Sequence, residues 1–157
     1  MPQLHITTFI AAPIERVFNL SRSINLHQIS TVDTNEKAVG GVLNGLINVN
    51  ETVTWQAKHL FKTRQFTSKI TEMKIPDCFT DEMIKGDFKS FYHEHHFKTA
   101  ENGTIMIDFL NFETPYGLVG KIVNRLFLTS YLEKLLKKRN EVIKEYAETQ
   151  KWKAILS

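Results

Sequence analysis

Hydrophobic and polar positions alternate with a period of two along much of the chain, and this alternation predicts β-strands. Residues 4–10 form a plausible first strand, and the pattern is strand-like again from Thr34 to Thr114. Turn signals interrupt this second region at regular intervals, at Gly40-Gly41, Asn44-Gly45, Pro76-Asp77, Gly86-Asp87 and Glu101-Asn102-Gly103. Because these connections are of hairpin length, the sequence predicts an antiparallel meander rather than βαβ units.

Two short helices are predicted between the first strand and the meander. Pro13 suits the first turn of a helix, and Glu15 lies near its positive end. Apolar residues at helical spacing give this helix one buried edge, formed by Ile14, Val17 and Phe18. A second helix is expected over roughly residues 23–29, with Ser21 or Ser23 as its cap.

One long helix is predicted after Pro115, ending at about Trp152. Its apolar residues form one stripe, made by Leu128, Tyr131, Leu132, Leu135, Leu136, Val142, Ile143 and Tyr146. An earlier apolar set points in another direction and contains Leu118, Val119, Ile122, Val123 and Leu126. A straight helix would not bury both sets in one core. The pattern therefore predicts a kink or break near residues 127–130, or a separate role for the first segment, such as gating a cavity or touching a membrane.

A long sheet and one amphipathic helix fit together if the sheet curves around the helix, and the space between them then becomes a core or a pocket. The chain has 157 residues, enough for one domain with a single core, and we assign residues 1–157 to that domain. The fold class is therefore α+β, with a curved antiparallel sheet wrapped around a long C-terminal helix and two short helices after the first strand.

Composition excludes several classes of partner. The apolar fraction of 42% and the charged fraction of 24% are ordinary for a globular protein. The net charge of +3 is spread over mixed helix faces, so we expect no nucleic-acid partner. No apolar run is long enough for an integral membrane segment, and Met1-Pro2-Gln3 does not resemble the start of a signal peptide. Cys78 is the lone cysteine, and we expect a cytoplasmic protein.

The order of elements resembles the helix-grip fold of the START-like superfamily, also called SRPBCC. The similar segments follow the family order: 12–18 for the opening helix, 53–59 for the third strand, then 76–81, 86–88, 93–97, 103–104 with Asp108 and Phe112, 115–117, and 135–136 with Arg139. The resemblance covers nearly the whole chain and is closest to bacterial ligand-binding and polyketide cyclase/dehydrase-like members. It implies a hydrophobic cavity between sheet and helix. Asn50 departs from the pattern, because related sequences often have glycine before Glu51.

Polar residues fall in phase with the apolar face of two neighbouring strands. His93 and His95 share a face with Phe91 and Phe97, and pairing through the turn at residues 101–102 brings His95 close to Asp108. The predicted ligand-binding residues are Trp55, His59, Phe66, Phe91, His93, His95, Met106, Asp108, Leu110, Phe112 and Arg139. A mostly apolar lining with a few polar groups is typical of a small-molecule pocket. The alternative is that His95 donates to Asp108 and both are satisfied core groups.

Arg139 lies at the centre of the apolar stripe, between Leu136 and Ile143, so it should point at the sheet. Arginine cannot lose its charge, and a buried arginine therefore needs an anion. That anion is either a protein carboxylate such as Asp108 or the carboxylate, phosphate or enolate of a ligand.

His93 and His95 could also ligate a metal, with His59 or Asp108 as third ligand. The resembled family is not usually metal-dependent, so we expect neither a metal nor another cofactor.

Three functions are compatible with these residues. We favour a module that binds a hydrophobic or aromatic small molecule. An alternative is a cofactor-independent enzyme, with His95 and Asp108 as catalytic acid/base and Arg139 stabilising an oxyanion. The third is an interaction protein with a filled cavity, whose outward Ile105, Ile107 and Phe109 support a homodimer.

Overall fold

The computed structural model describes residues 3–59, 61–114 and 118–157, with side chains from residue 126 onward in the last range. In these residues the chain forms one antiparallel sheet of seven strands, in the spatial order β1-β7-β6-β5-β4-β3-β2. The strands are β1 Gln3–Ile10, β2 Lys37–Gly41, β3 Thr52–His59, β4 Lys62–Lys74, β5 Cys78–Lys85, β6 Ser90–Ala100 and β7 Gly103–Glu113. The predicted meander is confirmed, and β1 adds to it by pairing with β7.

Positive φ angles explain why glycine and asparagine occupy two tight loops. Gly41 has a φ of +68°, and a Cβ there would lie 2.2 Å from the carbonyl oxygen of Thr52, so only glycine fits. Asn50 has a φ of 69°. Asparagine is among the few non-glycine residues that adopt this left-handed conformation readily. The loop before β3 thus keeps the backbone conformation that a glycine would favour.

Helices α1 (Ile14–Ser21) and α2 (Ile24–Ser30) follow β1 as predicted. Pro13 is the N-cap of α1 rather than a residue of its first turn. Of the two serines considered for the second cap, Ser23 is the cap, because its hydroxyl accepts from the Leu26 amide at 3.1 Å. Ser21 instead donates its hydroxyl to the Val17 carbonyl.

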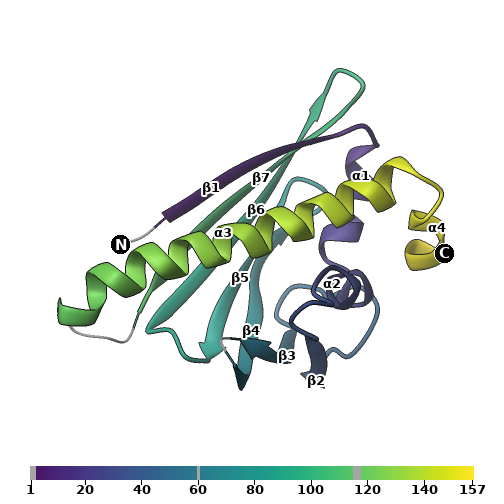
Figure 1. Cartoon of the computed structure of the whole chain (residues 1–157). Helices are drawn as coiled ribbons and strands as arrows, with labels where there is room; N and C mark the ends of the chain where they lie inside the picture. The colour runs from purple at the N-terminus through teal and green to yellow at the C-terminus, as the bar shows by residue number, and fades with distance from the viewer. Residues whose placement is uncertain (1–2, 60, 115–117) are drawn as a thin grey trace.

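Helix α3 (Leu118–Glu148) is unbroken, so the predicted break near residues 127–130 is wrong (Figure 1). No proline or glycine occurs between residues 121 and 148, and backbone hydrogen bonding does not require the apolar residues to stay on one face. The consequence is exposure, since Leu126 is 70% exposed and Phe127 53%. The side chains of Leu118, Val119, Ile122 and Val123 lie outside the described residues. The helix ends at Glu148 rather than near Trp152, which begins the short helix α4 (Trp152–Leu156).

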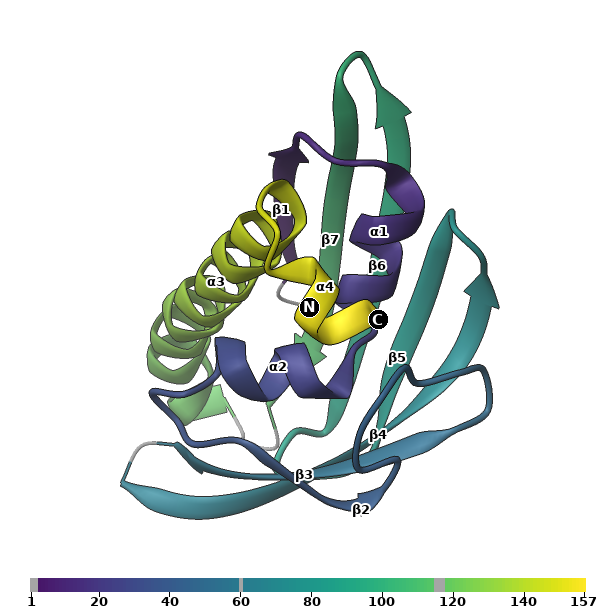
Figure 2. The same ribbon diagram turned by 90° about the vertical axis from the view of Figure 1, so that its right-hand side faces the viewer.

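The curved sheet encloses α3 on its inner face, and α1 and α2 cover the same face beside it (Figure 2). The apolar interior has two parts. The first core cluster gathers α1, α2, the inner side of the sheet and the end of α3, with Phe18, Phe79, Phe97, Met106 and Ile143 among its members. The second core cluster contains Leu4, Leu110 and Phe112, with partly buried Phe88, Phe91, Leu128, Leu132 and Leu136 packed against them.

The inward and outward faces of β7 are as the alternation predicts. Met106, Asp108 and Leu110 are fully buried on the inner face, whereas Ile105, Ile107 and Phe109 are half-buried on the outer face. Phe109 stacks on the ring of His5 in β1, with 4.5 Å between ring centroids. None of the helices in the described part of the chain combines the length and apolar character needed to span a bilayer.

Candidate functional site

A layer of polar residues separates the two core clusters. Along β7, Asp108 stands between Met106 of the first cluster and Leu110 of the second. Along β6, His95 and His93 stand between Phe97 and Phe91. Along α3, Arg139 and Asn140 stand between Ile143 and Leu136. Three elements therefore place polar side chains at the same level of an otherwise apolar interior, and all five side chains are buried.

The strand register explains why these groups meet. His95 lies opposite Asp108 of β7, as predicted, and His93 lies opposite Asp81 of β5. Residues opposite each other in antiparallel strands share a face, so three adjacent strands bring two imidazoles and two carboxylates together. The two imidazole rings stack with 3.8 Å between their centroids.

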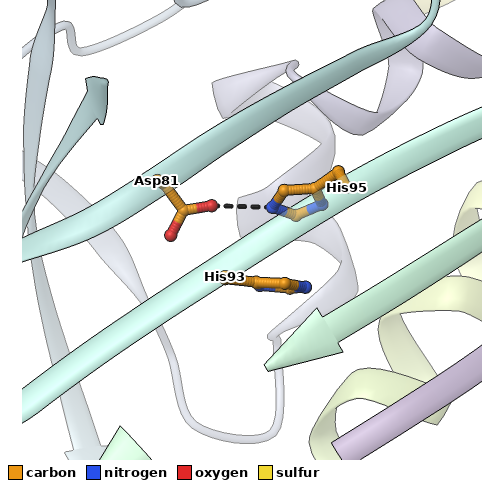
Figure 3. Close-up of side chains that lie close together, drawn as sticks. All are labelled: Asp81, His93 and His95. Atoms are coloured by element: carbon orange, nitrogen blue, oxygen red, sulfur yellow. Dashed lines mark hydrogen bonds and ion pairs between the residues drawn. The ribbon is translucent and has the colours of Figure 1, made fainter. Parts of the chain in front are cut away.

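The hydrogen bonds run between diagonal neighbours. His95 Nε2 donates to Asp81 Oδ2 at 2.7 Å (Figure 3). His93 Nε2 donates to Asp108 Oδ1 at 2.8 Å. The predicted hydrogen bond from His95 to Asp108 is therefore wrong. His95 Nδ1 lies 3.5 Å from Asp108 Oδ1, and in the described structure it is a buried nitrogen without a hydrogen-bond partner. Each imidazole thus bonds a carboxylate at a diagonal position rather than the one directly opposite.

Arg139 reaches this layer from α3, as predicted. Its guanidinium NH1 lies 3.7 Å from Asp108 Oδ1, and it donates to the Ser21 carbonyl at 3.1 Å and to Asn140 Oδ1 at 3.0 Å. Asn140 in turn donates its amide to Asp108 Oδ2 at 2.8 Å. Arg139 thus has a protein carboxylate nearby, but its direct hydrogen bonds go to neutral oxygens.

Burial and charge fix the protonation of the cluster. Burial raises the pKa of the Asp108 carboxyl, but the hydrogen bond from His93 and the charges of His93 and Arg139 outweigh this and hold that pKa well below its usual value. For Asp81, burial is likewise outweighed, mainly by the hydrogen bond and charge of His95, and the pKa is lowered. Burial lowers the pKa of His95 to about 4. At neutral pH both carboxylates are therefore ionised, and His95 is neutral with its lone pair on Nδ1.

Two members of the cluster were missed by the sequence reasoning. Asp81 is in phase with buried Phe79 on the same strand, so the alternation of β5 carried a signal. Asn140 follows Arg139 and is 2% exposed, but an asparagine on a helix gives no comparable pattern.

The other predicted site residues lie in or against the two core clusters, except His59, which lies at the end of β3. Phe66 and Phe91 are half-buried and contact edge to face, with 5.0 Å between ring centroids. Phe66 packs against the first core cluster, and Phe91 packs against the second, which contains Leu110 and Phe112. Trp55 belongs to the first core cluster and packs on the His27 ring at 4.2 Å.

His59 belongs to a separate network at the end of β3. Its Nδ1 lies 2.7 Å from the Tyr131 hydroxyl of α3, and its Nε2 lies 4.0 Å from Glu36, which is bonded to His27 at 3.0 Å. Burial lowers the pKa of His59, whereas the pKa of Glu36 is lowered because bonding to His27 outweighs burial. His59 is therefore not a third ligand to His93 and His95.

Within the residues that the structure describes, one group of three side chains could hold a metal ion: Asp81, His93 and His95, whose ligand atoms all lie within 4.8 Å of one another. Asp108, the other proposed third ligand, accepts hydrogen bonds instead. A shallow surface depression of about 290 Å³ occurs elsewhere, and none of the predicted site residues lines it; its walls are Lys62, Thr63, Arg64, Gln65, Thr67, Lys85, Gly86 and Asp87.

Solved structures share this arrangement over most of their length. The protein TTHA0849 from Thermus thermophilus is 19% identical, with a TM-score of 0.71 over 90% of this chain and 97% of that one. The Zhui aromatase/cyclase from Streptomyces sp. R1128 is 12% identical, with a TM-score of 0.74 over 94% and 93%. Ginseng major latex-like protein 151 from Panax ginseng is 18% identical, with a TM-score of 0.68 over 93% and 97%.

No family model matches the chain, and no curated protein is significantly similar to it. Likeness at these identities concerns the fold alone. The chain has an SRPBCC-type helix-grip fold, as the sequence resemblance implied.

Proposed function

We propose that this helix-grip chain binds a hydrophobic or aromatic small molecule, carrying one anionic or carbonyl group, between the sheet and α3. The observation that carries the proposal is the polar layer. Buried polar groups are costly unless they are satisfied, and His95 Nδ1 is buried without a partner in the described structure. A ligand group that donates a hydrogen bond to this nitrogen, or a water that the ligand holds, would remove that cost.

The apolar part of the ligand would lie toward the second core cluster. Phe88 and Phe91 are half-buried there, and so are Leu128, Leu132 and Leu136 of α3. Phe66 packs against the first core cluster and contacts the Phe91 ring. Removing apolar surface from water is favourable by about 25 cal/mol per Å². The apolar surface that these side chains leave exposed would therefore contribute binding free energy if the ligand covered it.

Arg139 is the proposed anchor for the anionic group. Its hydrogen bonds go to Ser21 and Asn140, and its distance of 3.7 Å from Asp108 leaves the guanidinium charge only partly compensated. A ligand carboxylate or enolate would complete a charge-assisted pair there.

Matched probes test the proposal. Anilinonaphthalene sulfonate carries an anion, whereas N-phenylnaphthylamine is a similar neutral molecule. We expect both to bind saturably at one site, with Arg139→Met weakening the anionic probe about tenfold or more and leaving the neutral probe within a few-fold. Arg16→Met is the control, because Arg16 bonds the Ala147 carbonyl at a distance from the cluster. If Arg139→Met does not fold, Arg139→Lys, which keeps the charge, replaces it in this binding test. Failure of both probes to bind would contradict the proposal.

A second candidate function is acid/base catalysis on such a ligand, without a cofactor. The Asp81–His95 pair favours it, since an ionised carboxylate orients the imidazole and leaves Nδ1 as a neutral base. Arg139 would stabilise the enolate formed when that base removes a proton next to a carbonyl. The test is turnover of cyclisation or dehydration substrates, in which Asp81→Asn should lower kcat by about 100-fold or more and keep the fold. Equal turnover by the variant would exclude this role.

A further inference from the structure

The geometry points to a metal site formed by Asp81, His93 and His95, which takes a divalent first-row transition metal such as Zn²⁺ or Fe²⁺. Two imidazoles and one carboxylate form a ligand set that suits these ions, and it does not suit Ca²⁺ or Mg²⁺, which prefer oxygen ligands. The three ligand atoms lie within 4.8 Å of one another. The inference concerns metal binding itself and does not depend on the proposed organic ligand.

The ligands come from two paired strands, which hold them in position. His93 and His95 project from the same face of β6, and Asp81 lies opposite His93 on β5. In a tetrahedral site with bonds of about 2.0–2.1 Å, neighbouring ligand atoms are roughly 3.3 Å apart. His95 Nε2 and Asp81 Oδ2 are 2.7 Å apart and hydrogen-bonded, so a metal ion would replace the proton between them. The His93 ring, which is stacked 3.8 Å from that of His95, would have to turn to bring its nitrogen to the same ion.

The surroundings of the two imidazoles are those of metal ligands. A ligating histidine usually donates its second ring nitrogen to a carboxylate, which fixes its tautomer. His93 Nε2 already donates to Asp108 at 2.8 Å, so Nδ1 is the nitrogen through which His93 would bind a metal ion. Asp108 is itself held by the Asn140 amide at 2.8 Å.

His95 gives the strongest argument. While its proton is on Nε2 and bonds Asp81, Nδ1 stays buried without a partner among the described residues, 3.5 Å from Asp108 Oδ1. When a metal takes Nε2, the proton moves to Nδ1 and can donate to Asp108 after a small approach. Metal binding therefore satisfies the buried nitrogen that the metal-free protein leaves unsatisfied, and both imidazoles are then oriented by the same carboxylate.

Access and charge are consistent with a metal ion. The Asp81 side chain is 18% exposed, against 4% for His95, so the ion reaches the site from the Asp81 side. Asp81 and Asp108 are two carboxylates against the single guanidinium of Arg139, so a divalent ion enters a site with an excess of negative charge when the imidazoles are neutral.

Cobalt(II) titration of chelator-treated protein tests the inference. We expect ligand-field absorption bands that saturate at one equivalent and are displaced by Zn²⁺. Asp81→Asn and His95→Gln should each weaken Co²⁺ binding about 100-fold, and Asp108→Asn, which removes the carboxylate behind both imidazoles, about 10- to 100-fold. His96→Ala is the matched control, because His96 is on the opposite face of β6 and bonds Glu94, and it should leave binding unchanged.

Far-UV circular dichroism shows which variants fold. If either Asp81→Asn or His95→Gln does not fold, the other ligand variant still tests the site. The inference is overturned if the native protein takes up no Co²⁺, or if His96→Ala weakens binding as much as His95→Gln. Binding of the neutral naphthylamine probe by metal-free protein is measured in parallel, so that failure of the metal site is distinguished from failure of the proposed ligand site.

Discussion

The stability of the protein should fall steeply with acid because His95 is buried as a neutral base. Its pKa is lowered from 6.5 to about 4 in the folded state, mainly by burial. Between these two values the unfolded chain binds a proton at His95 that the folded chain does not. Stability therefore rises with pH across this window and falls as pH is lowered from about 6.5 to about 4.

The size of the effect follows from the shift. Each pKa unit corresponds to about 1.4 kcal/mol, so a shift from 6.5 to about 4 implies about 3 kcal/mol in total, most of it realised by about pH 4.5. This is a large fraction of the 5–15 kcal/mol that is typical of domains. Asp81 and Asp108, whose pKa values are lowered from 3.8, add their own loss only at lower pH.

Urea unfolding of the native protein and of His95→Gln measures how much His95 contributes to the pH dependence of stability. The glutamine does not titrate and can still donate to Asp81. With a typical dependence on urea, the native midpoint should drop by about 1 M more than the variant midpoint between about pH 7 and pH 4.5. His59, whose pKa is also lowered, contributes equally to both proteins and cancels. Parallel pH dependence in the two proteins would refute the assignment of a neutral, buried His95.

Three further predictions concern the stability of the fold and the assembly of the protein. Asn50→Ala should cost about 1 kcal/mol, because φ is 69° there, whereas Asn50→Gly should be nearly neutral; thermal unfolding of both variants checks this. Leu110→Ala should cost about 2–5 kcal/mol in denaturant unfolding and Ile107→Ala clearly less, since the two residues occupy opposite faces of β7. The interaction-protein hypothesis predicts a dimer that Phe109→Glu dissociates, and a monomeric native protein in sedimentation experiments would contradict that hypothesis.

The sequence was sufficient for the features that depend on periodicity. The period of two placed Met106, Asp108 and Leu110 on the inner face of β7, and the helical period placed Arg139 against the sheet. The turn at residues 101–102 was short enough to set the register of β6 and β7, so the pairing of His95 with Asp108 was also predictable.

The hydrogen-bond partners of the histidines and the pairing of β5 with β6 could not be predicted from the sequence. They depend on side-chain conformation and on the register of strands that are joined by a longer connection. The connection between β5 and β6 does not fix their pairing from sequence, so Asp81 was missed although it lies opposite His93. Strand register also does not state whether an imidazole bonds the residue opposite or a diagonal neighbour, and both His93 and His95 bond a diagonal neighbour. The alternation put His59 on the pocket face, but its place at the end of β3 brings it to Tyr131.

The proposed function requires that the interior between the sheet and α3 bind a small organic molecule. Native mass spectrometry of freshly purified protein, compared with its mass after denaturation, tests this most directly. We expect a stoichiometric bound organic mass that denaturation releases and that Arg139→Met protein retains at a reduced level. If the fresh protein carries only its own mass, and neither naphthalene probe binds after purification, the claim of a ligand-binding interior is contradicted.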